Sequence, residues 1–210
     1  MKGPILDPEL EADLRRRAKI ALRKRYRALR ASVPAPARLI RSQRICEFAA
    51  QLEAFRAARS VALYWPVADS GEVDLGGLDA LAREQGKQVY YPCMAPIDGG
   101  FSTGFRATDN VEQLQLRGQK FCEPEPTAAL ATRDDIDLVF VPALAIDPRG
   151  YRLGFGSGFY DVTLPDHCPP ASTVAVVFDF QMVGELPNEP HDVLIDSWVT
   201  DRGSYQRAES

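Results

Sequence analysis

Four short apolar runs, separated by segments with a helical pattern, set the strongest limit on how this chain can fold. The runs are residues 61–65, 89–92, 137–142 and 173–178, and residues 195–200 form a short final one. Runs of this length, bounded by turn residues, are typical of buried strands. Strands that alternate with helices predict an α/β fold with a mostly parallel sheet covered on both faces.

Three segments have apolar residues at helical spacing: 13–31, 37–55 and 72–85. The first carries an apolar stripe made of Leu14, Ala18, Ala21, Leu22 and Leu29. Gly86 suits the left-handed position after the third helix. Residues 95–117 predict a hairpin with Gly99-Gly100 at its turn, and residues 122–135 predict a loop.

The composition is that of one ordinary globular domain. The chain has 210 residues, of which 45% are hydrophobic and 26% are charged. We expect residues 1–13 to be a flexible N-terminal segment and residues 14–205 to form a single domain. No signal peptide and no membrane-spanning run is recognised, and the four cysteines are widely spaced. These features predict a cytoplasmic protein with reduced thiols and no membrane partner. We also expect a monomer, although no sequence feature fixes the oligomeric state.

Residues 152–161, with the sequence RLGFGSGFYD, form the most informative motif. Its three alternating glycines can take positive φ angles and turn backbone N–H groups toward an anion. Gly158 is expected near a helix start, where the helix dipole favours a phosphate. Arg152 could pair with phosphate oxygens, and Asp161 could hold the magnesium ion that accompanies a nucleotide. A glycine turn without a ligand is an equal alternative, because the spacing fits neither a P-loop nor a dinucleotide fingerprint.

Positive charge is concentrated near the beginning of the chain. Residues 1–60 contain 15 Lys and Arg against 6 Asp and Glu, whereas the remainder contains 10 against 23. Lys19, Arg23, Arg27 and Arg30 share one face of the first predicted helix. A solvated helix face, a site for an anionic ligand and an RNA-binding surface are alternatives for this basic row. The net charge of −4 and the lack of interleaved aromatic residues disfavour a nucleic-acid partner.

Several motifs, taken in order, resemble the 5-formyltetrahydrofolate cyclo-ligase family. The strongest match is an apolar strand that ends in proline, residues 137–142, followed by the glycine motif within residues 150–161. The weaker matches are Lys19 with Arg23, residues 64–67 with 72–74, Glu123 with Pro124, and residues 186–187 with 191–192 and Asp196. Together they span residues 15–201, and their common order makes the resemblance specific.

The resemblance implies a three-layer α/β/α fold like that of sugar-phosphate isomerases and CoA transferases. It also implies an ATP- and magnesium-dependent ligase of folate and one-carbon metabolism. Such an enzyme converts 5-formyltetrahydrofolate to 5,10-methenyltetrahydrofolate and releases ADP and phosphate. In the implied mechanism the formyl oxygen attacks the γ-phosphate and N10 then closes the ring. Positioning and charge neutralisation would supply most of the rate acceleration.

The same resemblance assigns roles to individual residues. Glu72 would bind the N–H groups of the pterin, and Trp65 and Val67 would line that pocket. Asp161 and Asp192 would bind magnesium. The residues expected to bind the folate also include Phe155, Gly156, Ser157, Gly158 and Phe159. Those expected to bind ATP are Lys19, Arg23, Arg152, Leu153, Gly154, Phe155, Gly156, Ser157, Gly158, Phe159 and Tyr160.

Arg152 and Tyr160 are the candidates for catalysis, although Tyr160 also suits a packing role. Ser157 stands where family members often have glycine or lysine, and Phe159 replaces the first tyrosine of a pair. Either departure could lower the rate without changing the reaction. The competing hypothesis is a non-catalytic relative that binds nucleotide or folate as a sensor or partner protein, because a fold alone does not fix a chemistry.

Overall fold

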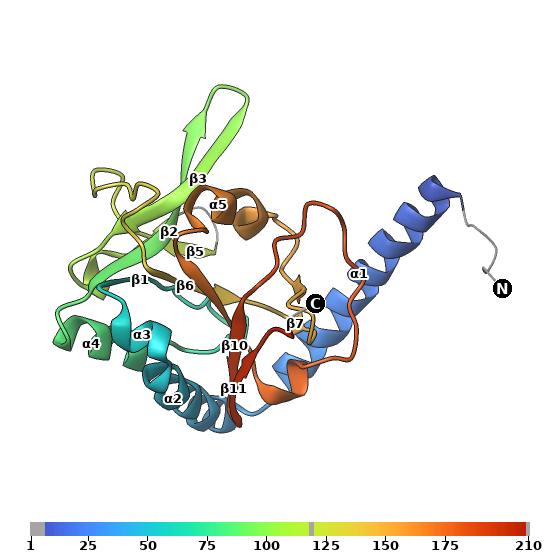
Figure 1. The fold of residues 1–210 in the computed structure, drawn as a ribbon, viewed down its shortest axis with the longest axis horizontal. Coiled ribbons are helices and arrows are strands. Elements are labelled where there is room, and N and C mark those ends of the chain that lie inside the picture. Colours follow the sequence, from blue (N-terminus) through green and yellow to red (C-terminus); the bar gives the residue numbers. More distant parts are fainter. Residues whose placement is uncertain (1–6, 118–119, 209–210) are drawn as a thin grey trace.

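The computed structural model of the protein describes residues 7–117 and 120–208. Its centre is a seven-stranded sheet with the order β11-β10-β9-β6-β1-β2-β3 (Figure 1). The strands are β1 (Ser60–Ala62), β2 (Gln88–Ile97), β3 (Gly100–Ala107), β6 (Leu138–Pro142), β9 (Ser172–Val176), β10 (Ser197–Thr200) and β11 (Gly203–Gln206). The five inner strands run parallel, and the edge strands β3 and β11 pair antiparallel. The predicted mostly parallel sheet is therefore confirmed.

Both faces of the sheet are covered, because alternate residues of the inner strands point to opposite sides. Leu138 and Phe140 of β6 belong to the core on one face, whereas Val139 and Val141 belong to the core on the other. The first face is covered by α2 (Ala35–Gln51), α3 (Glu53–Ala57) and α4 (Gly76–Glu84). The second is covered by α5 (Phe159–His167). This arrangement is the expected three-layer architecture.

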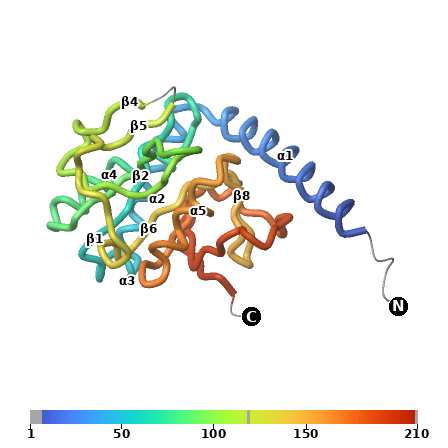
Figure 2. Tube along the Cα trace, turned by 90° about the horizontal axis from the view of Figure 1, so that it is seen from above, coloured from blue at the N-terminus to red at the C-terminus, as the bar shows by residue number. Residues whose placement is uncertain are grey.

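Short elements complete the fold. β4 (Gln115–Arg117) pairs with β5 (Phe121–Glu123), and β7 (Ala145–Ile146) pairs with β8 (Arg152–Leu153), both antiparallel. Two 3-10 turns cover Val111–Gln113 and Asp179–Gln181. The long helix α1 (Pro8–Ser32) runs along the end of the molecule that carries β7 and β8, and Tyr26 packs there against Leu144 and Leu153 (Figure 2).

Several boundaries differ from the prediction. Helix α1 begins at Pro8 rather than near residue 13, because the Asp7 carboxylate accepts a hydrogen bond from Glu9 N and proline suits the first turn. Residues 8–13 are thus helical, and residues 1–6 lie outside the described part. The segment predicted as one helix over 37–55 splits at Leu52, whose backbone is extended. Strand β5 begins the segment predicted as a loop, and β11 was not predicted.

Most of the apolar stripe of α1 is exposed to solvent, whereas an amphipathic helix normally buries its apolar side. Leu14 is 47% exposed and Leu29 is 38% exposed, and Ala18 and Ala21 are also exposed. The N-terminal half of the helix extends away from the domain (Figure 1). The opposite face, which carries the basic row, lies against the rest of the protein. Among the helices of residues 7–117 and 120–208, none is both long and apolar enough to cross a membrane.

Candidate functional site

The glycine loop, residues 152–158, leads from β8 directly into α5. Gly158 has φ +74° and is the N-cap of the helix, as predicted. Gly156 also has a positive φ, +105°, whereas Gly154 does not. Gly156 and Ser157 are exposed. The loop therefore presents backbone at the start of a helix, which is an arrangement suited to an anion.

The basic row of α1 faces this loop and the neighbouring loop of residues 66–72, here called the Glu72 loop. Arg23 Nε donates to the carbonyl oxygen of Gly154 at 3.0 Å, and Arg27 Nη2 donates to that of Phe155 at 2.8 Å. Arg30 Nε donates to the carbonyl oxygen of Ser70 at 2.9 Å. The alternative of a solvated helix face is therefore wrong for Arg30, which is buried, and for Arg23, which is partly buried, whereas Arg27 remains exposed while it makes its hydrogen bond.

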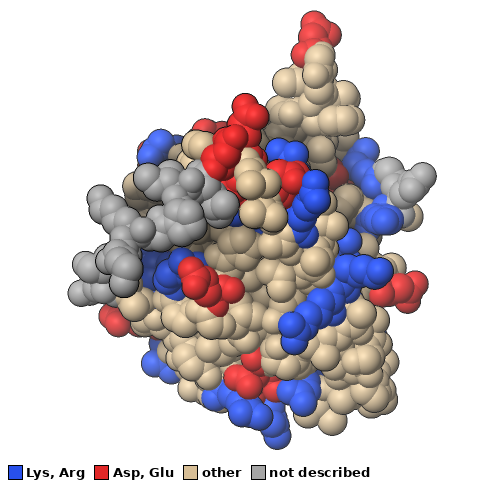
Figure 3. All heavy atoms as spheres, turned by 90° about the vertical axis from the view of Figure 1, so that its right-hand side faces the viewer, with Lys and Arg blue, Asp and Glu red and all other residues tan. Residues whose placement is uncertain are grey.

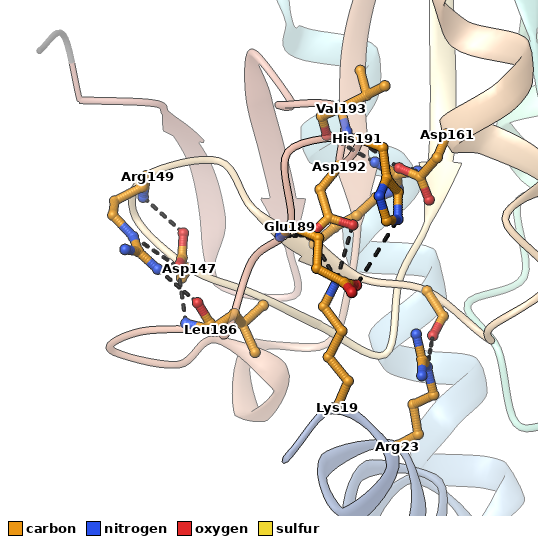
Figure 4. A network of polar contacts seen from close by, with 12 residues as sticks. Lys19, Arg23, Asp147, Arg149, Asp161, Leu186, Glu189, His191, Asp192 and Val193 are labelled. Carbon is orange, nitrogen blue, oxygen red and sulfur yellow. Dashed lines mark hydrogen bonds and ion pairs between the residues drawn. The ribbon is translucent and has the colours of Figure 1, made fainter. Parts of the chain in front are cut away.

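Lys19, the first member of the row, is buried in an ion-pair cluster (Figure 4). Its Nζ lies 2.6 Å from Glu189 Oε2 and 2.7 Å from Asp192 Oδ2. Hydrogen bonding to Lys19 lowers the pKa of Glu189. His191, whose side chain is 70% exposed, has Nε2 3.9 Å from Glu189 Oε2. Glu189, His191 and Asp192 are close enough together to share a metal ion.

A hollow of about 350 Å³ opens beside this cluster. Its lining residues are Arg15, Tyr151, Asn188, Glu189, Pro190, Asp192 and Leu194.

Asp161, the other predicted magnesium ligand, makes a separate ion pair. Its Oδ1 lies 2.7 Å from Nη2 of Arg152, whose side chain is only 4% exposed. The same oxygen accepts a hydrogen bond from Val193 N at 3.2 Å, and Arg152 Nη1 donates to the carbonyl oxygen of Val193 at 2.9 Å. Arg152 thus connects β8, the first turn of α5 and the segment that follows Asp192. In this structure Asp161 and Asp192 belong to different ion pairs.

Glu72 is partly buried at the end of its loop. Its Oε2 accepts hydrogen bonds from Val67 N at 2.7 Å and from Ser70 Oγ at 3.1 Å. Burial raises the pKa of Glu72, while these hydrogen bonds and the charge of Arg30 oppose the shift. A carboxylate with one oxygen held in place can accept hydrogen bonds from a ligand with the other.

Aromatic side chains pack beside the start of α5 and beside the start of the Glu72 loop. The rings of Phe159 and Tyr160 lie 5.0 Å apart, and both contact Phe105 of β3. Burial and the charge of Glu72 raise the pKa of Tyr160, so its hydroxyl stays protonated and can donate a hydrogen bond. Trp65, which precedes the Glu72 loop, packs edge-on against Tyr91 at 6.4 Å.

The structure therefore gathers the predicted residues around α1, the glycine loop and the Glu72 loop. The sequence motifs did not single out Glu189 or Phe105, and they gave Arg30 no role beyond membership of the basic row. Glu189 could have been suspected because it precedes Asp192 by three residues. Arg30 could have been suspected from its spacing with Arg27. Nothing in the sequence indicates that Phe105 contacts α5.

The fold and this site define an α/β protein with a glycine loop suited to an anionic ligand, and comparisons with known proteins identify its family. The model of the 5-formyltetrahydrofolate cyclo-ligase family matches residues 15–201, so the chain belongs to this family. The 5-formyltetrahydrofolate cyclo-ligase of Escherichia coli K12 is 32% identical over 149 residues, which cover 68% of this chain and 78% of that protein. The enzyme of the same name from Haemophilus influenzae is 29% identical over 176 residues, which cover 82% and 91%.

Two further comparisons agree. A 5-formyltetrahydrofolate cyclo-ligase of Mycolicibacterium smegmatis is 43% identical over 79 residues, which span 38% of this chain and 41% of that protein. The NMR structure of 5,10-methenyltetrahydrofolate synthetase from Aquifex aeolicus superposes with a TM-score of 0.77 at 28% identity and covers 91% of this chain and 94% of its own. The prediction of a ligase of this family, with its α/β fold, is confirmed.

Proposed function

We propose that this protein closes the ring of 5-formyltetrahydrofolate in an ATP-dependent reaction between the glycine loop and the Glu72 loop. The observation that carries the proposal is the contact of one helix with both loops. Arg23 of α1 reaches the glycine loop at Gly154, and Arg30 reaches the Glu72 loop at Ser70. A segment suited to phosphate and a buried carboxylate are therefore held side by side.

In this proposal the phosphates of ATP lie against the backbone N–H groups of residues 154–158 and the N-terminus of α5. Lys19 and Arg23 supply positive charge from α1, and Arg152 supplies it from β8. The side chains Phe155 and Phe159 border the folate. Little covalent chemistry is asked of the protein, because phosphoryl transfer is accelerated mainly by positioning and charge stabilisation.

Glu72, with Trp65 and Val67 beside it, would hold the pterin end of the folate. The carboxylate matches the adjacent N–H donors of the pterin. Tyr160, protonated and close to both Glu72 and Arg152, can donate a hydrogen bond to the formyl group or to a phosphate oxygen. These contacts would hold the formyl oxygen near the γ-phosphate and exclude water from it.

The carboxylate oxygens of Asp161 and Asp192 are of the kind that magnesium prefers as ligands. Asp161 and Asp192 would hold it, and Oδ2 of Asp161 accepts no hydrogen bond from the described residues. When bound, the ion would supply positive charge beside the phosphates. The residues' own part is to provide one carboxylate from the segment 189–193, that of Asp192, and one from the first turn of α5, that of Asp161, whose Oδ1 accepts from Val193 N.

The test is turnover by the full chain with 5-formyltetrahydrofolate, ATP and magnesium, followed by the near-ultraviolet absorbance of the methenyl product. We expect product formation that requires ATP and is strongly reduced in Glu72→Gln. Lys24→Met, which removes an exposed charge on the outer side of α1, is the matched control. Folded protein that binds ATP and folate without turnover would contradict the proposal and support a binding role.

Nucleic-acid binding is disfavoured by the surface. On the face seen in Figure 3, Lys and Arg are interspersed with Asp and Glu. The basic row of α1 is also engaged by the protein itself. We further propose a monomeric, cytoplasmic enzyme without nucleic-acid or membrane partners, and light scattering after gel filtration tests the monomeric state.

A further inference from the structure

Arg30 is a buried charged residue to which the roles above give no contact with substrate. It is 2% exposed. Its Nε donates to Ser70 in the Glu72 loop, and its guanidinium carbon lies 5.0 Å from the ring centroid of Phe155 in the glycine loop. Its stem packs beneath Gly71, where an added Cβ would lie 3.5 Å from Arg30 Cγ. The guanidinium therefore lies between the two loops of the site.

Most of the hydrogen-bonding capacity of this guanidinium is unused. A guanidinium has five N–H donors, and within residues 7–117 and 120–208 only Nε of Arg30 has a partner. The described polar atoms that are both sealed from solvent and unpartnered are Arg117 Nε and Trp198 Nε1. The Nη atoms of Arg30 are not among them, so they border a space that solvent can enter. Hydrogen-bond donors without partners on a buried cation require an explanation. An acceptor atom of a bound ligand would satisfy them.

Ser70 connects Arg30 with the carboxylate of Glu72, because its carbonyl oxygen accepts from Arg30 Nε and its hydroxyl donates to Glu72 Oε2 at 3.1 Å. Each group acts on the other: the Glu72 charge raises the pKa of Arg30 against the effect of burial, and Arg30 lowers that of Glu72. The remaining charged or titratable groups that act on Arg30 are Tyr64, Arg27 and Arg38. No ion pair joins Arg30 to Glu72 among the described side chains. The unused Nη donors of Arg30 and the unused Oε1 of Glu72 therefore belong to one hydrogen-bonded cluster, as far as the described residues show.

This pair matches one edge of the pterin, which presents the 2-amino N–H, the N3–H and the C4 carbonyl oxygen in sequence. That edge reads donor, donor, acceptor. We propose that Arg30 donates from an Nη atom to the C4 carbonyl oxygen, while Glu72 accepts from the adjacent N–H groups. The inference rests on the proposed function and makes Arg30 a specificity-determining residue for 4-oxo pteridines.

The chemical consequence is discrimination against a 4-amino pteridine. An amino group at C4 places a donor opposite the donors of Arg30, so both remain unsatisfied in a partly desolvated site. N3 then carries no hydrogen, so Glu72 also loses one of its two donors. Loss of one hydrogen bond to a charged group corresponds to a change in Kd of about 10- to 100-fold. Wild-type protein should therefore bind 5-formyltetrahydrofolate more tightly than its 4-amino-4-deoxy counterpart by at least about this factor.

The experiment measures the Kd of both compounds by calorimetry with the full chain and with Arg30→Met. We expect the preference of the wild type to decrease about tenfold or more in Arg30→Met, because 5-formyltetrahydrofolate binds more weakly, and to stay above unity, because Glu72 still distinguishes N3–H from a bare N3. Arg27→Met is the matched control. Arg27 lies over the same Phe155 ring, at 5.7 Å, and donates to the Phe155 carbonyl oxygen, but it has no contact with the Glu72 loop. It should keep the wild-type ratio.

Arg30→Lys keeps the experiment decisive if Arg30→Met folds poorly. Lysine keeps the charge but lacks the planar fork that can donate to Ser70 and to the ligand together, so the preference should again decrease. A wild-type ratio in folded Arg30→Met or Arg30→Lys, or equal binding of both compounds by the wild type, would overturn the inference. Wild-type protein that binds neither compound would instead contradict the proposed function.

Discussion

Arg152→Met is expected to lower the free energy of unfolding by about 2–4 kcal/mol. The Arg152 side chain is 4% exposed, and it makes one ion pair, with Asp161, and one hydrogen bond, to the Val193 carbonyl oxygen. Removing one partner of a buried pair typically costs about 3–5 kcal/mol. The Asp161 side chain is 26% exposed, so water can partly replace the lost cation and reduce that cost.

The effect should reach beyond the pair itself. Val193 N and Arg152 Nη2 share Oδ1 of Asp161, so Arg152 holds the segment that carries Asp192 against the first turn of α5. Loss of this contact should loosen both predicted magnesium ligands. Folded Arg152→Met should therefore also bind ATP with magnesium more weakly than the wild type, by at least about tenfold for one lost charged hydrogen bond.

Denaturant unfolding followed by circular dichroism measures the first effect, and thermal unfolding should show a decrease in Tm of about 4–16 °C. Arg202→Met is the matched control. Arg202 pairs with Asp179 at 3.2 Å, but its side chain is 74% exposed, so its removal should cost less than about 1 kcal/mol. Equal, small losses in both variants would refute the claim that the buried pair holds the site together.

Three further changes have expected outcomes. Gly156→Ala should lower the free energy of unfolding by about 1–3 kcal/mol because φ is +105°, whereas Gly154→Ala, with open space and no positive φ, should cost less than about 1 kcal/mol in the same denaturation assay. Lys19→Met should cost about 2–4 kcal/mol because two carboxylates lose their common cation, and the exposed Lys24→Met should be nearly neutral. Burial raises the pKa of Glu72, so its contribution to stability is present below the unfolded pKa, near 4.5, and is lost as pH rises through the folded pKa. Glu72→Gln should remove this loss in unfolding curves measured against pH, while it weakens folate binding about tenfold or more.

The sequence predicted the inner sheet and the glycine loop well, because both depend on local signals. A buried parallel strand needs a continuous apolar run, and residues 137–142 show one. A left-handed N-cap needs glycine, and Gly158 occupies that position. The edge strand β11 lacks such a signal, since its side chains alternate between partly buried and exposed positions.

The orientation of α1 could not be predicted from its own residues. Helix amphipathicity normally places apolar residues inside and charges outside. Here the buried face is basic, because its partners are carbonyl oxygens of the glycine loop and carboxylates far along the chain. Lys19 pairs with Asp192, which is 173 residues away. The resemblance to known motifs supplied the role of this face, whereas the residues alone left it open.

The pairing of charges around the glycine loop determines how a nucleotide can enter the site. Lys19 and Arg152 are each held by carboxylates, whereas Arg23 donates to a carbonyl oxygen and forms no ion pair among the described residues. A phosphate can therefore meet Arg23 without displacing an anion, but it can recruit Lys19 or Arg152 only if their carboxylates receive another positive charge. Those carboxylates, Asp192 and Asp161, are the groups proposed to hold magnesium. If the nucleotide arrives with its magnesium ion, its phosphates can pair with Lys19 and Arg152 while the ion pairs with Asp192 and Asp161. The proposed site should therefore bind the metal-bound nucleotide more tightly than the free one.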